Sequence, residues 1–265
     1  MNNWTNRRSN WSARPFSPEI NQEGFTLVEL LIAMVIGGVI ITAVYSTYLA
    51  QQRTYTEQEQ VVEMQQNIRA AMDRLTRDIR TAGFDPTRSA GAKITTAQAG
   101  QFSFTRDITD NPGTGESDGD TNDPGELIDY GFSASATATQ RDVDRNGRLD
   151  DTNGDGILNE VASLGRQTGG AGGYQPIADT IQAIEFRYLD KEGNVTADLK
   201  KINAVQVSIL ARAAQPDPKF TNGQTYTPAS GVAWDLNGPA AGEAPNDNFR
   251  RRLLIATVQC RNMGL

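Results

Sequence analysis

One stretch of the sequence limits the fold more than any other. It is an apolar run that begins after Gly24 and continues to Ala50. Because a helix rises 1.5 Å per residue, about 20 apolar residues cross a hydrocarbon core of about 30 Å. The segment from Phe25 to Tyr45 is long enough to do so. The run therefore predicts one membrane-spanning helix near the N-terminus.

A carboxylate stands near the start of this span, at Glu29. A charged side chain at the centre of a bilayer costs roughly 2.5 kcal/mol or more, so an ionisable residue within a span is a functional candidate that needs a partner. We expect the partner of Glu29 to be either a cation of another chain or an unusual amine of this one.

The sequence Gly24-Phe25-Thr26-Leu27-Val28-Glu29, with the apolar run behind it, resembles the type IV prepilin signature, also called the class III signal. The resemblance implies that prepilin peptidase cuts between Gly24 and Phe25 on the cytoplasmic side, and that the new amine of Phe25 is methylated. It also implies that Glu29 pairs with this amine in a neighbouring subunit. The alternative is an ordinary signal anchor with an incidental glutamate. A secretory signal peptide fits poorly, because the run is too long and no A-x-A-like site follows it.

The residues that precede the span, Met1 to Glu23, are mostly polar and include Arg7, Arg8 and Arg14. Arginines before a first span favour a cytoplasmic N-terminus. We therefore interpret residues 1–24 as a cleaved leader and exclude them from the fold.

The helical pattern continues beyond the span. From Val61 to Ile79 apolar residues recur at spacings of three and four, which predicts an amphipathic helix. No proline occurs between Phe25 and Ala82, and Gly83 is a suitable residue to end a helix. The sequence predicts one helix with a transmembrane part (25–50) and an amphipathic part (51–83). Within the span only Gly37 and Gly38 could loosen the helix during assembly.

The remaining residues, 84–265, predict a β-rich domain with loop inserts, and the acidic insert covers residues 106–160. Alternation of apolar and polar residues predicts antiparallel strands with one buried face. That face is expected to cover the helix stripe, which gives an α+β fold. Strands are expected at 93–96, 101–105, 126–132, 181–189, 202–212 and 253–260, and loops at 165–173 and 216–248.

Three later segments, 186–190, 205–209 and 252–262, resemble the PilW-type minor pilins and the related J-type pseudopilins of type II secretion. The resemblance implies the type IV pilin fold. It also implies a structural subunit that primes or caps a pilus, reached through the inner membrane, with other pilins, other minor pilins and a tip adhesin as partners. A secretion pseudopilin is the alternative, and a membrane-anchored binding module is a third possibility.

Acidic residues are concentrated in one part of the chain. The formal net charge is −7, but residues 106–160 hold 14 acidic and 4 basic residues. This segment disfavours nucleic acid as a partner and favours a divalent cation.

Within this acidic segment a nine-residue pattern, D-x-[DN]-x-[DN]-G-x-L-[DN], occurs twice in succession. Alternate oxygen side chains can converge on a hard cation, and the glycine allows the sharp turn. The repeat resembles EF-hand-type and thrombospondin-like calcium loops, although it lacks the glutamate expected at position 12. The alternative is a pair of solvated turns. The candidate calcium ligands are Asp142, Asp144, Asn146, Arg148, Asp150, Asp151, Asn153, Asp155, Ile157, Asn159 and Glu160.

No enzymatic activity is expected. The chain contains no histidine, no G-x-S-x-G sequence and no P-loop. Its one cysteine, Cys260, cannot form an intrachain disulfide, and we interpret it as a small buried hydrophobe, with an intermolecular thiol as the alternative.

Overall fold

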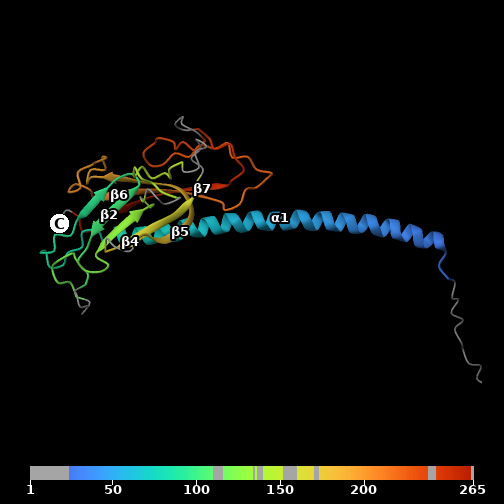
Figure 1. Ribbon diagram of the computed structural model, residues 1–265, viewed down its shortest axis with the longest axis horizontal. Coiled ribbons are helices and arrows are strands. Elements are labelled where there is room, and N and C mark those ends of the chain that lie inside the picture. Colours follow the sequence, from blue (N-terminus) through green and yellow to red (C-terminus); the bar gives the residue numbers. More distant parts are fainter. Residues whose placement is uncertain are drawn as a thin grey trace, which may run out of the picture. The chain divides into compact units, whose positions relative to one another are not determined.

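A computed structural model describes residues 24–109, 116–133, 135, 140–151, 160–169, 173–237 and 243–263. The chain forms two compact units, Met1–Arg53 and Thr54–Leu265. One helix, α1 (Leu27–Ile79), contributes residues to both units. The second unit also contains seven strands (Figure 1): β1 (Ile94–Ala97), β2 (Gln101–Thr105), β3 (Leu127–Gly131), β4 (Ala162–Thr168), β5 (Gln175–Leu189), β6 (Ala204–Arg212) and β7 (Arg251–Gln259).

The seven strands form one sheet in sequence order, from β1 to β7. Every neighbouring pair is antiparallel, so each strand lies beside the next one along the chain. The predicted α+β class, a long N-terminal helix packed on an antiparallel sheet, is confirmed.

The core lies between the second half of α1 and one face of the sheet. Helical spacing brings Met64, Ile68 and Leu75 to one buried stripe. In β2 the alternation points Phe102 and Phe104 to the same interior, while Ser103 between them faces the other side. The helix repeats about every 3.6 residues and the strands every 2, and the apolar side chains that these repeats bring to one face form a single cluster.

A buried polar contact fixes the end of α1 to the sheet. Asp78 Oδ2 accepts a hydrogen bond of 2.6 Å from the Tyr130 hydroxyl and another of 2.6 Å from Arg166 Nε. Burial opposes ionisation of Asp78, but these hydrogen bonds and the charges of Arg166 and Arg74 outweigh it and lower its pKa. The carboxylate therefore ties the helix to β3 and β4 in its charged form.

The other face of the sheet carries a second apolar cluster. Tyr226, Trp234 and Leu236, from the insert between β6 and β7, pack on Ala183 and Leu210. The long insert is thus a layer over β5 and β6 rather than a free loop.

The loop predicted at 165–173 and the strand start predicted at 181 were both wrong. Residues 165–168 belong to β4, and β5 begins at Gln175, before its predicted start. Gly165 is needed there for close packing, since a Cβ at this position would lie 2.4 Å from Tyr174 Cβ. A glycine within a strand often marks such a close approach, so it did not indicate a loop.

Cys260 is 1 % exposed and belongs to the main core. Burial raises the pKa of its thiol to about 12, so the reactive thiolate is disfavoured. The interpretation of Cys260 as a buried hydrophobe is confirmed.

Candidate functional site

The N-terminus of α1 is closed by a reciprocal set of hydrogen bonds between Thr26 and Glu29. The backbone N–H and the hydroxyl of Thr26 both donate to Glu29 Oε2, each at 2.9 Å. The N–H of Glu29 donates to Thr26 Oγ1 at 3.3 Å. This is a capping box, which satisfies N–H groups that a helix start leaves without partners. Sequence reasoning missed this second role of Glu29, although the T-x-x-E spacing signals it.

The first half of α1 presents apolar side chains around its circumference. α1 is the one candidate membrane span among the described residues, and none of its most apolar window is buried by the chain itself. Phe25 is 92 % exposed and Leu27 is 73 % exposed. A helix that is hydrophobic all round is typical of a membrane span or of a helix buried among others.

A second candidate site is the loop from Asp142 to Asp150. Carboxylate oxygens of Asp142, Asp144 and Asp150 lie within 4.8 Å of one another. Asp142 is fully buried and accepts hydrogen bonds from the N–H groups of Asn146 (3.1 Å) and Gly147 (2.9 Å). The side chain of the first residue is thereby held inside the loop that it opens.

Gly147 is required by this geometry. Its φ is +86°, and a Cβ would lie 1.9 Å from the carbonyl oxygen of Ile184. The Gly147 carbonyl accepts a hydrogen bond of 2.8 Å from the Ile184 N–H, and Arg148 bridges to Ala183. The loop therefore pairs with the part of β5 that β4 does not reach.

The electrostatics of the loop are unfavourable without a counter-charge. Burial, with a smaller contribution from the neighbouring Asp144, raises the pKa of Asp142 to about 6, although the hydrogen bonds from Gly147 and Asn146 oppose the shift. Arg141 Nε lies 3.4 Å from Asp150 Oδ2, so one cation of the chain reaches the outer carboxylate. Two close carboxylates, one of them buried, are the situation that a bound divalent cation relieves.

Two sequence comparisons bear on these sites. A family described as "Prokaryotic N-terminal methylation motif" matches residues 20–45, and one described as "Type IV Pilus-assembly protein W" matches residues 150–262. The chain is therefore similar to prepilins at its N-terminus and to PilW-type proteins over residues 150–262. No curated protein matches the chain significantly. Among solved structures, a type IV-like pilin from Thermus thermophilus is 17 % identical with a TM-score of 0.39, covering 75 % of this chain and 97 % of that one.

The N-terminal candidate site lies within one of the two matched regions, whereas most of the acidic loop lies outside both. The methylation motif contains Gly24, Phe25 and Glu29, which agrees with the predicted signature. The PilW-like region begins at residue 150 and includes β4 to β7. The loop residues Asp142 to Leu149 precede that region. Anything the loop binds is therefore a property of this chain and does not follow from the match.

Other predicted ligands do not join the three carboxylates. Asp151 is described but lies outside the converging group. The charge of Glu160 acts on Arg212, whose pKa burial lowers to about 10. The predicted ligands Asn153, Asp155, Ile157 and Asn159 lie outside the described residues.

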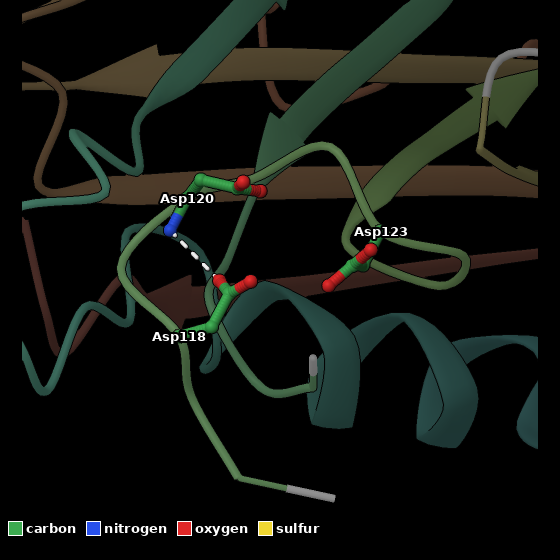
Figure 2. A group of neighbouring side chains, drawn as sticks. All are labelled: Asp118, Asp120 and Asp123. Atoms are coloured by element: carbon green, nitrogen blue, oxygen red, sulfur yellow. Dashed lines mark hydrogen bonds between the residues drawn. The ribbon is translucent and has the colours of Figure 1, made fainter. Parts of the chain in front are cut away.

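A further acidic group was not predicted. Oxygens of Asp118, Asp120 and Asp123 lie within 4.8 Å of one another. Figure 2 shows the three side chains. The N–H of Asp120 donates to Asp118 Oδ1 at 3.0 Å, and the buried carboxylate of Glu126 accepts from the Asp123 N–H at 3.1 Å. The D-x-D-x-x-D spacing was the available signal, but the composition of this segment suggested a loop without stable structure. Acidic side chains on such a loop do not by themselves indicate a cation.

Proposed function

We propose that this protein is a minor pilin, a structural subunit that primes the assembly of a type IV pilus or caps its tip. The observation that carries the proposal is the methylation motif at the start of a helix whose apolar half is exposed. The PilW-like region supports a pilus rather than a secretion pseudopilus, which shares the N-terminal signature.

In this proposal the chain is first an inner-membrane protein with its N-terminus in the cytoplasm. Prepilin peptidase removes residues 1–24, and the new amine of Phe25 is methylated. The apolar half of α1 then leaves the lipid and packs among the helices of other pilins, while the globular unit is extracellular. Other minor pilins and a tip adhesin are its expected partners.

Glu29 acts in docking. Its Oε2 accepts both hydrogen bonds from Thr26, whereas Oε1 accepts none among the described residues. The charged amine of Phe25 of a neighbouring subunit can approach Oε1 without disrupting the cap. A carboxylate in an apolar helix bundle is costly unless it is paired, so this contact favours one register between subunits.

The test is the chemical state and location of the protein in cells. We expect pili sheared from the cell surface to contain a form that begins at methylated Phe25, and immunogold labelling to mark fibre ends. Gly24→Leu should leave uncut precursor in the inner membrane, because the peptidase approaches the backbone closely at glycine. A mature chain that starts beyond Phe25, or a processed chain absent from the fibres, contradicts the proposal.

We also propose that calcium stabilises the loop from Asp142 to Asp150. In an EF-hand, ligands come from positions 1, 3, 5, 7 and 9, with glycine at position 6. Asp142, Asp144 and Asp150 occupy positions 1, 3 and 9, and Gly147 occupies position 6 with a positive φ.

The two remaining positions of the calcium loop also fit. The amide oxygen of Asn146, at position 5, lies in the loop interior, where it accepts from the Arg148 N–H at 2.8 Å. Arg148 would supply its main-chain carbonyl at position 7. Calcium supplied to these oxygens would neutralise the Asp142–Asp144 repulsion and stabilise the pairing of the loop with β5.

Thermal unfolding of the full chain in detergent tests this. At 100 times its dissociation constant, calcium should stabilise the fold by about 2.7 kcal/mol, and magnesium or chelator should not. Asp144→Ala, at an exposed position, should abolish the shift in the unfolding midpoint. The matched control is Asp118→Ala with Asp120→Ala, which should keep it. Equal unfolding midpoints with calcium and with chelator would contradict the proposal and support the alternative of a solvated turn.

A further inference from the structure

The two edges of the sheet are built differently. β1 has four residues, and its pairing with β2 shifts register between Ile94 and Thr96. Short and bulged edge strands are a common way to prevent pairing with another chain. β1 is thus protected against strand addition.

β7, at the other edge, has none of this protection. It has nine residues and pairs with β6 residue for residue, from Arg251 opposite Arg212 to Gln259 opposite Ala204, without a register shift. It contains no proline and no lysine, and no charged residue follows Arg252 within it. A long, regular edge strand of this kind is competent to pair with a further strand.

The hydrogen bonds at its two ends show which groups of β7 face outward. The Ala213 N–H donates to the Arg250 carbonyl, and the Cys260 N–H donates to the Asn203 carbonyl, both at 2.8 Å. In an antiparallel pair such contacts alternate, so even-numbered residues of β7 bond to β6. The N–H and C=O groups of Leu253, Ile255, Thr257 and Gln259 therefore point away from the sheet. Among the described residues no main-chain group bonds to them.

The side chains of β7 indicate which partner fits. In the middle of the strand, Ile255 is 44 % exposed and Leu253 is half-buried. Arg252, near the start of β7, and Arg261, in the turn after its end, are exposed and form no ion pair among the described residues. Arg251, by contrast, is neutralised by Asp247 at 2.6 Å.

We propose that the free edge of β7 binds an extended strand of another protein, apolar in its middle and acidic at both ends. Main-chain hydrogen bonds to the outward groups would supply affinity, as in strand addition to other sheets. Acidic residues near Arg252 and Arg261 would supply specificity through complementary charge. A second copy of β7 fits poorly, because its ends carry arginines of the same charge. The proposal does not depend on the pilus assignment.

A synthetic peptide tests the edge directly. The probe is the end-blocked peptide D-T-V-T-V-T-V-T-D, added to the ¹⁵N-labelled full chain in detergent at about ten times its dissociation constant. Amide hydrogen exchange should slow about tenfold at Leu253, Ile255 and Thr257, since about nine-tenths of the outward groups are then occupied. The amides of β1 serve as the internal control. Unchanged exchange at these three residues, up to a peptide concentration on the order of 1 mM, overturns the proposal.

Variants separate edge pairing from side-chain effects. Thr257→Pro removes an outward donor without removing a bond to β6, so it should abolish peptide binding and keep the fold. The matched control is Thr257→Ala, which should still bind. Arg252→Glu with Arg261→Glu should reverse the preference, so that a peptide with lysine at both ends binds better. Equal binding of the two peptides to the unmodified chain contradicts the proposed specificity.

Self-association is the remaining outcome. If a second copy occupied the edge, antiparallel pairing about Ile255 would bring both Ile255 residues together. Ile255→Cys would then form a disulfide-linked dimer in the absence of peptide, whereas Thr257→Cys would not. Such a dimer overturns the proposed acidic partner, and its absence together with peptide protection supports it.

Discussion

The two halves of α1 share one regular backbone and have opposite surfaces. From Leu27 to Ala50 apolar side chains face outward on all sides, and none of the most apolar window is buried. From Met64 to Ile79 a stripe of apolar residues is buried against the sheet, and polar residues fill the rest. Helix formation is thus the same in both halves, and only the partner differs.

The two halves therefore differ in where they obtain the stabilisation that comes from burying apolar side chains. Burying one leucine or isoleucine side chain stabilises a structure by roughly 1.5–3 kcal/mol. The second half obtains this stabilisation from its own sheet. The first half can obtain it only from lipid or from other helices, so its residues are expected to control location and assembly without affecting the stability of the globular unit.

The largest effect is expected at Glu29. Glu29→Ala should remove the proposed pairing with a neighbouring Phe25 amine, and losing one partner of a buried ion pair costs roughly 3–5 kcal/mol. Such a loss lowers an equilibrium by about a hundredfold or more. Quantitative immunoblots of sheared pili should therefore show almost none of the variant, although it is inserted and cleaved.

Glu59, an exposed glutamate in the second half of the same helix, provides the control. Glu59→Ala should enter pili normally. If Glu29→Ala did so too, the docking role of Glu29 would be wrong, and its capping of the helix would be its remaining function.

Truncation of an apolar side chain should lower the stability of the globular unit only when the residue lies in the second half of α1. Leu75 is fully buried in the second half, and Leu75→Ala should lower the free energy of unfolding by about 3 kcal/mol. Ile40 is 56 % exposed in the first half, and Ile40→Ala should leave the unfolding of the globular unit unchanged. Denaturant unfolding in detergent compares the two. A similar loss for both variants would show that the halves are not energetically separate.

Sequence patterns predicted those features that depend on periodicity. Spacings of three and four indicated the buried stripe of α1, and alternation indicated Phe186, Tyr188, Val205 and Val207 in paired strands. Both signals are direct consequences of side-chain direction in a helix and a strand. The N-terminal signature was equally local, because its residues are consecutive.

Features that depend on tertiary contact were not predictable in this way. Gly165 was interpreted as a loop residue because nothing in the sequence indicates that Tyr174 packs against it. Trp234 lies within the predicted loop 216–248, and only the fold assigns it to a second cluster over β5 and β6. The Asp142 loop was predicted from its spacing, but its pairing with Ile184 was not.

A smaller effect, dependent on pH, is expected at Asp78. Its folded pKa lies below the ordinary value of 3.8, so its contribution to stability is fully present above that value and is lost as the pH falls through the folded pKa. Asp78→Asn should cost about 2 kcal/mol at neutral pH, because hydrogen bonds to a charged acceptor become neutral ones. The difference between the two proteins should narrow below about pH 4.

The control for pH lies on the same helix. Asp73 is exposed, and Asp73→Asn should change the free energy of unfolding by less than about 0.5 kcal/mol at any pH. Urea unfolding at pH 3 and at pH 7 measures all three proteins. A constant difference between the unmodified chain and Asp78→Asn would show that the charge of Asp78 does not fasten the helix to Tyr130 and Arg166.

The smallest effect tests whether the apolar half is as rigid as the packed half. Apart from the neighbouring residues and the nearby backbone of the helix itself, no described atom lies within 4 Å of a Cβ built at Gly37 or Gly38, so alanine fits at both positions. Each glycine weakens a helix by roughly 1 kcal/mol relative to alanine. The hydroxyl of Thr42 also donates to the Gly38 carbonyl at 2.8 Å, and such a contact slightly weakens the helix.

The double variant Gly37→Ala with Gly38→Ala should therefore slow amide exchange at Ile41 and Thr42. In an α-helix the N–H groups of these two residues donate to the carbonyls of residues 37 and 38. Each substitution contributes about 1 kcal/mol, which corresponds to roughly a fivefold slower exchange by local opening. Exchange at Ile68, in the packed half, should not change. If it slowed equally at all three positions, the two halves would open as one unit, and the comparison between them would fail. If the first two amides slow but assembly proceeds at the same rate, melting at the glycines is not a step of assembly.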